Sequence, residues 1–543
     1  MFSEPAIGEK FFGREDVLEL LTKRAAALKD GYRQNVALTG QSLSGKSSII
    51  LQFLYTIKEE GFVPVYVEVV KEPFRSFANK FVATMLYNSL IKMGEAPGIE
   101  MEALMEKARG KLPKTLAAIK TVNSLVERGD LDEAYLNLLA LTSSLKDETG
   151  LSCIVMLDEF DNLESLGIRN PFLGFGKIIM VQKDTMYIVS SSRNEAIKKI
   201  ISEKLSLLFG NFEVVNVSNF DLETAARFID SKLSGFDIDM TIKRFLIAFT
   251  DGNPFYLDKI AGRTKEMALG RMKSYIEKED VTGAILDLVY DSGGSLHQYL
   301  LNYLLELLDT KNKDILLGVL CAIANGHNKT TEIARSLKVK QADAAKGMLR
   351  LVELGLISKN GVFYNIDDSM LEFWLKYVYQ RKKAFLIDGM IDKRSVFAGE
   401  VDAYLSAFIE ELSMPITARI AELFNLFSNE LFFVESRNIK LPHFTKVEIM
   451  ESENSKTYIA ASFRGNFWIA QAYEAAVTEN DIVNYVRNVK NMGHKLSNKI
   501  IMPLKGMDEN ARLLAKELKI SIWEGQALNR LLKAYGKKRA AIL

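Results

Sequence analysis

Cysteine is scarce in this chain, and long apolar runs and net charge are missing as well. The 543 residues include two cysteines, Cys153 and Cys321, each inside an apolar run. This excludes a disulfide framework or a cysteine-based zinc site and suits a reducing compartment. No apolar run approaches the roughly 18 residues that a membrane span needs. The net charge of +1 gives no global attraction to nucleic acid or membrane, so any such surface must be local.

The first residues, "MFSEPAIGEKFFGRE", have no basic region followed by an apolar core, so we expect no signal peptide. We therefore expect a cytoplasmic protein without membrane contact. The four histidines (His297, His327, His443 and His494) show no ligand spacing, which leaves a zinc centre unsupported. The length predicts about three or four domains of an ordinary globular protein.

The stretch "ALTGQSLSGKSSII" fits the G-x-x-x-x-G-K-[ST] phosphate loop from Gly40 to Ser47. An apolar strand, "NVALT", precedes it and a helical pattern follows, so this is more than a chance glycine-rich turn. Backbone N–H groups and a helix N-terminus would surround the phosphates of a bound ATP. Lys46 would neutralise the β- and γ-phosphates, and Ser47 would ligate Mg²⁺. The expected nucleotide contacts of the loop are Gly40, Ser44, Gly45, Lys46, Ser47 and Ser48.

A second strand is expected to supply the carboxylates of the site. In "SCIVMLDEFDNLESL" the apolar run Ile154 to Leu157 predicts a strand buried on both faces, followed by Asp158 and Glu159. Asp158 would hold Mg²⁺, directly or through water, and Glu159 would polarise the attacking water. The alternative is a solvated strand end, which the phosphate loop upstream disfavours.

A third strand, "TMYIVSSSR", ends in Ser190, Ser191 and Ser192. A small polar side chain at this place, for which we name Ser192, would sense the γ-phosphate or position water. The alternative is that the three serines only mark the junction between a strand and a loop, without a role at the nucleotide.

The ordered set "FFGREDVLELL", the phosphate loop, "VMLDEFDNL", "IVSSS" and "TDGNPFYL" resembles the archaeal ATPases of the AAA+/STAND group over roughly residues 8 to 380. The resemblance implies that Phe12, Gly13 and Arg14, together with Gly252-Asn253-Pro254, flank the adenine and ribose. It also implies that Pro254 lies in a helical lid whose angle reports the bound nucleotide.

One position departs from the pattern of those ATPases. They often carry Gly-Arg in a loop after the third strand, where this chain has Gly210-Asn211. If that arginine normally stabilises the transferring phosphate, Arg193 or a partner must substitute for it. Because an arginine finger contributes about 10³-fold or more in rate, we expect slow hydrolysis or a switch-like role.

The segment after the lid predicts three short helices, "KDILLGVLCAIANG", "KTTEIARSLK" and "KQADAAKGMLRLVELGLI", followed by a hairpin at Asn360-Gly361. This is the winged-helix pattern, with the third helix as a possible reader of the DNA major groove. We name Lys340, Lys346 and Arg350 as its candidate DNA contacts. A purely structural or protein-docking role is the alternative, because the face is only mildly basic.

The C-terminal region contains a local basic segment. Residues 481 to 543 hold 13 Lys/Arg and 5 Asp/Glu, so the balance is 13 − 5 = +8. It is interpreted as either a second DNA-contacting surface or a solvated face.

The same region resembles the restriction-endonuclease-like fold that follows the winged helix in some archaeal ATPases, through "FFVESRN", "KVEIMES", "TYIAASFRGN" and "ISIWEGQALNRLLKAYG". A nuclease of this fold needs an acid on one strand and Glu-x-Lys or Asp-x-Lys on the next. Glu448 supplies the first acid, but the next strand has Ala461 and Phe463, or Ser462 and Arg464, at the two places. Some nucleases recruit the missing acid from a neighbouring helix, and Glu474 is within reach in sequence. We nevertheless expect no DNA cleavage, because neither register supplies the second carboxylate.

The predicted fold class is α/β, with a RecA/AAA+-like P-loop core, a helical lid, a winged helix and a C-terminal α/β domain resembling restriction endonucleases. The expected boundaries are 1–215 for the core (with a helical insertion at about 72–150), 216–305 for the lid, 306–384 for the winged helix and 385–543 for the last domain. We expect a DNA-associated ATPase that takes ATP/ADP and Mg²⁺, with a homo-oligomer or a protein partner possible in principle. The runner-up is a STAND-type switch that assembles with proteins without DNA, and an ATP-driven nuclease is the weakest reading.

Overall fold

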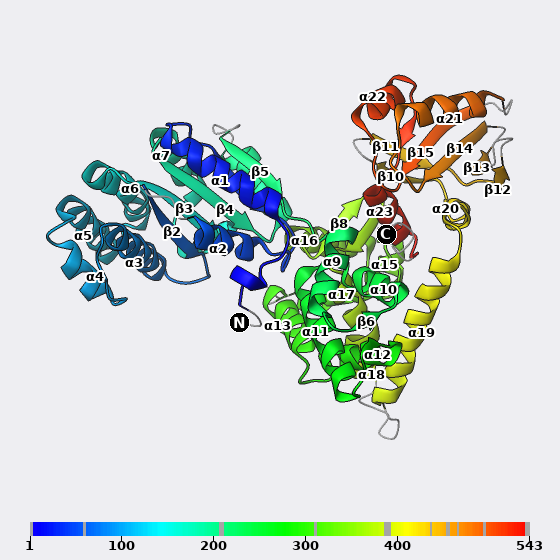
Figure 1. Cartoon of the computed structure of the whole chain (residues 1–543), viewed down its shortest axis with the longest axis horizontal. Coiled ribbons are helices and arrows are strands. Elements are labelled where there is room, and N and C mark those ends of the chain that lie inside the picture. The colour runs from blue at the N-terminus through cyan, green and yellow to red at the C-terminus, as the bar shows by residue number, and fades with distance from the viewer. Residues whose placement is uncertain are drawn as a thin grey trace. The chain divides into compact units, whose positions relative to one another are not determined.

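The computed structural model describes residues 4–57, 61–205, 211–308, 312–384, 393–434, 437–451, 457–463, 466–491 and 496–537. The chain divides into two compact units, residues 1–219 and 220–543 (Figure 1). Each unit is described by itself.

Unit 1 is built on a five-stranded sheet with the order β2-β3-β4-β1-β5, in which all pairs are parallel. The strands are β1 (Asn35–Thr39), β2 (Phe62–Glu68), β3 (Ser152–Asp158), β4 (Thr185–Ser191) and β5 (Phe212–Asn216). Strands β1, β3 and β4 are buried along their whole length, as a parallel sheet covered on both faces requires. The α/β class and the parallel sheet of the core are thus confirmed.

Alternate residues of the strands face two separate cores. Val36 and Leu38 pack with helices α1 (Glu15–Lys29) and α2 (Lys46–Thr56), whereas Ala37 faces the opposite side. That opposite side is covered by α7 (Pro171–Val181) and by four helices between β2 and β3. Those helices are α3 (Phe74–Lys92), α4 (Met101–Ala108), α5 (Pro113–Arg128) and α6 (Leu131–Thr149), which lie together beside β2 (Figure 1). Their apolar stripes pack into the core on this side of the sheet.

Unit 2 begins with a largely helical part. Its elements are α9 (Leu222–Lys232), β6 (Asp237–Ile238), α10 (Met240–Thr250), α11 (Pro254–Gly270), β7 (Tyr275–Ile276), α12 (Lys278–Ile285), η5 (Leu286–Tyr290) and α13 (Ser295–Leu307). Three helices follow, α14 (Lys313–Ala324), α15 (Thr330–Leu337) and α16 (Gln341–Glu353), and then the antiparallel hairpin of β8 (Ile357–Asn360) and β9 (Phe363–Ile366). The order of three helices and a hairpin agrees with the prediction from the sequence. The helices α17 (Ser369–Trp374), η6 (Leu375–Tyr379), α18 (Gln380–Ala384), α19 (Lys393–Ser413) and α20 (Ile416–Asn425) complete this part.

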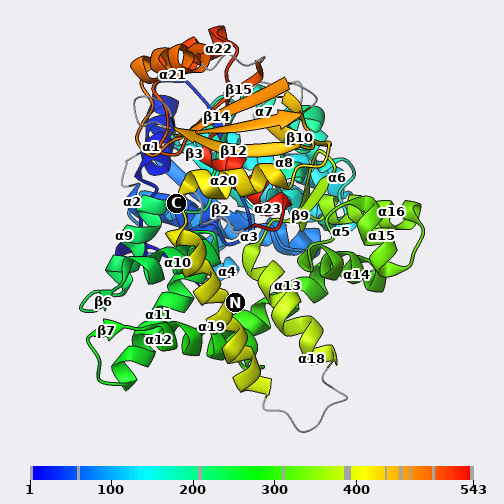
Figure 2. The same ribbon diagram turned by 90° about the vertical axis from the view of Figure 1, so that its right-hand side faces the viewer.

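The end of unit 2 contains a second sheet, of order β12-β13-β14-β15-β16. The first three strands are antiparallel, and β14, β15 and β16 are parallel to one another. The strands are β12 (Lys446–Glu451), β13 (Thr457–Phe463), β14 (Asn466–Tyr473), β15 (Leu496–Pro503) and β16 (Ser521–Ile522). Helices α21 (Glu479–Asn491) and α22 (Glu509–Glu517) cover one face, and α20 and α23 (Gly525–Ala534) cover the other (Figure 2).

The β8–β9 hairpin is held by the strand β10 (Glu430–Val434), which pairs with β11 (Arg437–Leu441). The Asn360 amide replaces a backbone pair: its Nδ2 donates to the Phe433 carbonyl at 3.1 Å and its Oδ1 accepts from the Phe433 N–H at 2.7 Å. The Val362 N–H donates to the Leu431 carbonyl at 3.3 Å. The tip of the hairpin is therefore bound along β10.

Gly361→Ala is expected to weaken this contact. A Cβ at residue 361 would lie 1.9 Å from the Leu431 carbonyl oxygen, in a left-handed backbone with φ 60°. The left-handed backbone alone costs an alanine about 1–2 kcal/mol, and overpacking adds about 1–3 kcal/mol. Gly326→Ala is the matched control, because Gly326 has φ 93° and open space around its Cβ within the described residues. Equal losses of Tm in the two variants, measured by calorimetry, would contradict the hairpin contact.

Candidate nucleotide site

The phosphate loop runs from the end of β1 to the start of α2, as the sequence predicts. Gly40 is required by close approach, since a Cβ there would lie 2.3 Å from the Val217 carbonyl oxygen and 2.9 Å from the Ser44 hydroxyl. Gly45 has φ 99°, which an L side chain rarely adopts, and it precedes the first helical residue, Lys46. The buried Ser44 hydroxyl has no hydrogen-bond partner within the described part of the chain. A hydroxyl without a partner, in a loop with glycine at both ends, fits an anionic ligand such as a phosphate.

Lys46 is buried, with 4% of the residue exposed. Its ammonium donates to the carbonyl oxygens of Gly40 at 3.1 Å and Gln41 at 2.8 Å, so it lies across the loop. Burial lowers the pKa of Lys46, and the nearby carboxylates of Glu159, Asp158 and Asp161 oppose that shift. The structure therefore brings the predicted lysine and the predicted acids into one electrostatic cluster.

Asp158 ends β3 and is 2% exposed. Its Oδ1 accepts hydrogen bonds from the Ser190 hydroxyl and, at 3.1 Å, from the Glu159 N–H. Its Oδ2 accepts from the Tyr66 hydroxyl at 3.3 Å. Because both oxygens already accept hydrogen bonds, the arrangement favours a metal contact of Asp158 through water.

Tyr66 is a site residue that the sequence analysis missed. Burial raises the pKa of its hydroxyl, with the Asp158 charge as the next cause, so it remains a hydrogen-bond donor. The signal was a tyrosine within the apolar strand "VPVYVEVV", but only the β2–β3 register reveals its partner.

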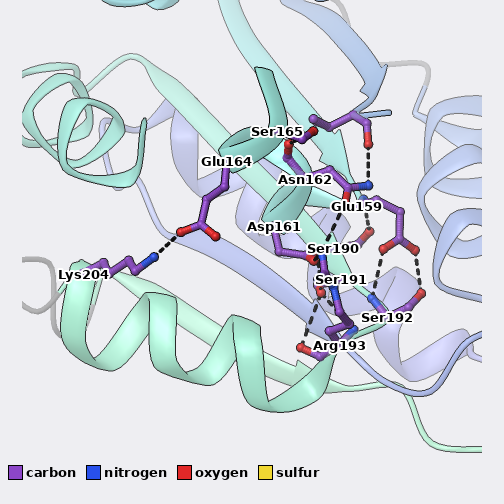
Figure 3. Close-up of polar contacts among 11 residues, drawn as sticks. Glu159, Asp161, Asn162, Glu164, Ser165, Ser190, Ser191, Ser192, Arg193 and Lys204 are labelled. Atoms are coloured by element: carbon purple, nitrogen blue, oxygen red, sulfur yellow. Dashed lines mark hydrogen bonds and ion pairs between the residues drawn. The ribbon is translucent and has the colours of Figure 1, made fainter. Parts of the chain in front are cut away.

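Glu159 follows Asp158 in a left-handed conformation, with φ 52°. Its Oε1 accepts a hydrogen bond from the Ser192 hydroxyl at 2.5 Å, and its Oε2 accepts from the Ser192 N–H at 3.3 Å (Figure 3). Burial raises the pKa of Glu159, while the Lys46 charge and the Ser192 hydrogen bond lower it. Ser192, the residue named from the sequence, thus contacts the candidate base directly.

Arg193, named as one possible substitute for an arginine finger, is engaged with other groups. Its guanidinium forms an ion pair with Asp161 and donates to the Asn162 side-chain oxygen at 3.1 Å. Gly210 lies outside the described residues, and the Asn211 carbonyl accepts a hydrogen bond from the Asn35 N–H at 3.0 Å.

The segment that contains Phe12, Gly13 and Arg14 lies beside the loop. Gly13 and Arg14 have left-handed backbones, and the Arg14 guanidinium donates to the carbonyls of Ser44, at 3.4 Å, and Ser218. Arg14 therefore ties the start of α1 to the phosphate loop. The Ser48 hydroxyl accepts from the Ala6 N–H at 3.0 Å, so in this structure that hydroxyl holds the N-terminal segment.

Pro254 belongs to unit 2, where it is the first residue of α11. Asn253 caps this helix, since its Oδ1 accepts from the N–H groups of Phe255 at 3.0 Å and Tyr256 at 3.4 Å. Gly252 has φ 67°, and a Cβ there would lie 2.3 Å from the Phe220 carbonyl oxygen. These residues form the turn between α10 and α11, and a contact of Pro254 with nucleotide stays a prediction.

The three candidate DNA contacts lie together at α16. Lys340 is its N-cap residue, and Lys346 and Arg350 are exposed on the helix. Arg350 forms an ion pair with Glu353 at 2.9 Å, which reduces the positive charge available on this face.

A cavity of about 740 Å³ lies within unit 2, among α10, α17, α19 and the end of α23. Charged side chains on its wall are paired, Arg381 with Glu400 and Lys533 with Glu372. Such pairs hold the surrounding helices together, and the cavity adds no chemistry to the nucleotide site.

Among the residues that the structure describes, no helix is long and apolar enough to cross a membrane. No group of three or more His, Cys, Asp or Glu residues among them is placed to hold a metal ion.

No family model matches the chain, and no curated protein matches it either. Among solved structures, it is similar to the Walker-type ATPase PABY2304 of Pyrococcus abyssi, with 15% identity, a TM-score of 0.46 and coverage of 69% of this chain and 99% of that one. It is also similar to the Aeropyrum pernix ORC2 protein in ADPNP–ADP complexes (12% identity, 70% and 98% coverage, TM-score 0.42). The ORC1 protein of the same organism in complex with DNA has 14% identity, 69% and 94% coverage and a TM-score of 0.39. At these identities and TM-scores the similarities establish no activity, partner or family for this chain.

Proposed function

We propose that the chain binds and hydrolyses ATP at the phosphate loop. The observation that carries the proposal is the convergence of a buried ammonium, Lys46, with the carboxylates of Asp158 and Glu159 next to the loop. An ammonium in this place complements phosphate oxygens, and a buried carboxylate beside it can orient water. ATP hydrolysis by the purified chain, measured with and without Mg²⁺, tests the proposal.

The residues present fit a magnesium ion as well. Ser47 at the start of α2 and Asp158 at the end of β3 would hold it, Asp158 through water. Bound Mg²⁺ would neutralise phosphate charge. Glu159, held by Ser192, would polarise the attacking water through a remaining acceptor site of its carboxylate. With Asn211 in the place of an arginine, we propose that hydrolysis is slow.

We further propose that the ATPase is DNA-associated and contacts DNA through α16. Lys340, Lys346 and Arg350 are exposed, and lysine and arginine side chains are common phosphate contacts. The hairpin that follows is bound along β10 by Asn360, so it is not counted as a DNA contact. The nucleotide state would then reposition the winged-helix and C-terminal parts, with the basic C-terminal segment as a second DNA-contacting surface.

Replacing Lys340, Lys346 and Arg350 by alanine is expected to weaken DNA binding and flatten its salt dependence. Each neutralised phosphate contributes about 0.9 to the slope of log K against log salt, so the slope should fall by up to about three phosphate equivalents. Fluorescence anisotropy with duplex DNA across a salt series measures it. Alanine at Lys120, Arg128 and Lys278, three exposed cations of α5 and α12, is the control for net charge. A slope equal to that of the control would mean that DNA contacts the basic segment, residues 481–543, or does not bind the protein.

A nucleotide switch that assembles with proteins without DNA is the second candidate. The observation that favours it is that β10 binds the tip of the β8–β9 hairpin. The hairpin, which would be the wing of a winged helix, is therefore engaged in a contact within the protein. DNA binding that is absent at low salt, together with nucleotide-dependent capture of a partner, would select this candidate.

A nuclease activity has the least support. Glu448 is exposed and ion-paired with Lys446 at 2.5 Å, and Ala461 on the next strand is buried in the apolar core. Arg464 lies outside the described residues. The third strand, β14, offers Gln471, whose side-chain oxygen accepts from the Tyr473 hydroxyl at 2.8 Å, in place of an acid.

A further inference from the structure

A second buried acid, Asp161, lies two residues beyond Glu159 and has no part in the roles proposed above. It is 4% exposed and belongs to the short 3-10 helix η2 (Phe160–Leu166). Its Oδ1 accepts a hydrogen bond from the Ser191 hydroxyl at 2.6 Å, and its Oδ2 forms an ion pair with the Arg193 guanidinium (Figure 3). A carboxylate this deeply buried needs such partners.

These contacts hold the residues on both sides of Ser192. Asp161 fixes Ser191 through its hydroxyl and Arg193 through its guanidinium. The Arg193 N–H also donates to the Ser191 hydroxyl at 3.0 Å. The backbone of residues 191–193 is thereby fixed, and with it the N–H group that Ser192 presents to Glu159.

The same network is anchored to a neighbouring strand. Arg193 donates to the Asn162 side-chain oxygen at 3.1 Å, and the Asn162 Nδ2 donates to the Val69 carbonyl, just after β2, at 2.9 Å. The contacts of Asp161 and Arg193, here called the clamp, therefore join the C-terminal ends of β2, β3 and β4. This is the edge where parallel α/β sheets bind their ligands.

We propose that Asp161 and Arg193 are positioning residues of the ATPase, which hold Ser192 and, through Ser192, the Glu159 carboxylate. The inference rests on the proposed function. Glu159 meets Ser192 with both oxygens, at 2.5 and 3.3 Å, so a displacement of residues 191–193 changes where the base points. Misplacing a catalytic group by about 1 Å lowers rates by roughly 10²-fold.

A purely structural ion pair is the competing explanation, and it has different consequences. Loss of a structural pair lowers Tm and the fraction of active protein, without changing the kcat of the molecules that remain folded. Loss of the contacts around Ser192 displaces the Glu159 carboxylate, which Ser192 holds through two hydrogen bonds. The kcat of the folded molecules should then fall while their affinity for ATP stays the same, because the phosphate loop is not altered.

The experiment compares the parent chain with Arg193→Gln, Arg193→Lys, Ser192→Ala and the double variant Arg193→Gln/Ser192→Ala. We expect Arg193→Gln to lower kcat about tenfold or more and to leave the Kd of a fluorescent ATP analogue within about threefold. Arg193→Lys keeps the charge beside Asp161 and should restore most of kcat. In the Ser192→Ala background the hydroxyl contact with Glu159 is already lost and only the N–H of residue 192 remains. Arg193→Gln should therefore lower kcat by less there than in the parent, because groups that act through a shared contact are not additive.

Glu164→Gln is the matched control, since Glu164 lies on the same η2 helix and forms an exposed ion pair with Lys204 (Figure 3). If Arg193→Gln does not fold, Asp161→Asn tests the same clamp, because its amide can still accept the Ser191 hydroxyl. A variant that matches Glu164→Gln in kcat, or full additivity with Ser192→Ala, overturns the inference while ATP hydrolysis by the parent stands. A parent chain that does not hydrolyse ATP overturns the proposed function, and this inference with it.

Discussion

Lys46→Ala is expected to raise the Kd for ATP at least about 100-fold, which corresponds to about 2.7 kcal/mol. The ammonium is buried against the loop carbonyls of Gly40 and Gln41, and no substituted methyl group can neutralise phosphate oxygens there. Its loss also removes the cation that interacts with the carboxylates of Asp158 and Glu159, which adds repulsion toward an anionic ligand. Titration with a fluorescent ATP analogue, in the presence of Mg²⁺, measures the change.

Lys111→Ala is the control for this variant. It removes the same charge from an exposed ion pair with Glu95, in the loops of the segment between β2 and β3, and should leave Kd unchanged. Because Lys46 is buried, the Tm of each variant must be measured as well. A folded Lys46→Ala chain that binds ATP within about threefold of the parent would show that the loop is not the nucleotide site.

The loop and the strand that precedes the acids were predictable from local pattern. Strand β1 and helix α2 follow from an apolar run and a helical period on either side of Gly40 to Ser47, and β3 follows from the apolar run before Asp158. In each case a single chain segment contains the whole signal. The three helices and the hairpin before residue 367 are local in the same sense.

The partners of the site residues were not predictable, because they depend on register between strands far apart in sequence. Ser192 meets Glu159, and Arg193 meets Asp161, only because β3 and β4 are neighbours in the sheet. Arg193 was named as a substitute for an arginine finger, and its ion pair with a buried acid assigns it a different contact. Tyr66 reaches Asp158 for the same reason, through the pairing of β2 with β3.

Asn360 and Gly361 of the hairpin have a local role, which the sequence shows, and a tertiary role, which it does not. Asn360-Gly361 predicts a turn, and the turn is present. The sequence does not show that Asn360 also pairs with the Phe433 backbone, or that Leu431 leaves no room for a Cβ at Gly361. That second use of the two residues is what removes the hairpin from the candidate DNA surface.

Glu159→Gln is expected to keep ATP binding and to lower turnover by about 10²- to 10⁴-fold, the usual contribution of a general base. The amide keeps the shape of the side chain and can still accept the hydrogen bond from the Ser192 hydroxyl, so the loop should not change. One negative charge fewer beside Lys46 should leave the affinity for ATP equal or higher. Phosphate release under single-turnover conditions separates the two effects.

The pH dependence gives this variant a second readout. Because burial raises the pKa of Glu159, the parent should lose activity on acidification at a pH above the value of about 4.3 that is usual for a glutamate. Ionised Glu159 is the active form, so the rate should fall as the pH drops through that raised pKa and be full well above it. The residual rate of Glu159→Gln should not show this fall at low pH, whereas the control Glu164→Gln should show it. Turnover at the parent rate in Glu159→Gln would assign the base to another residue, and Asp158 and Asp161 would remain as buried carboxylates near Lys46.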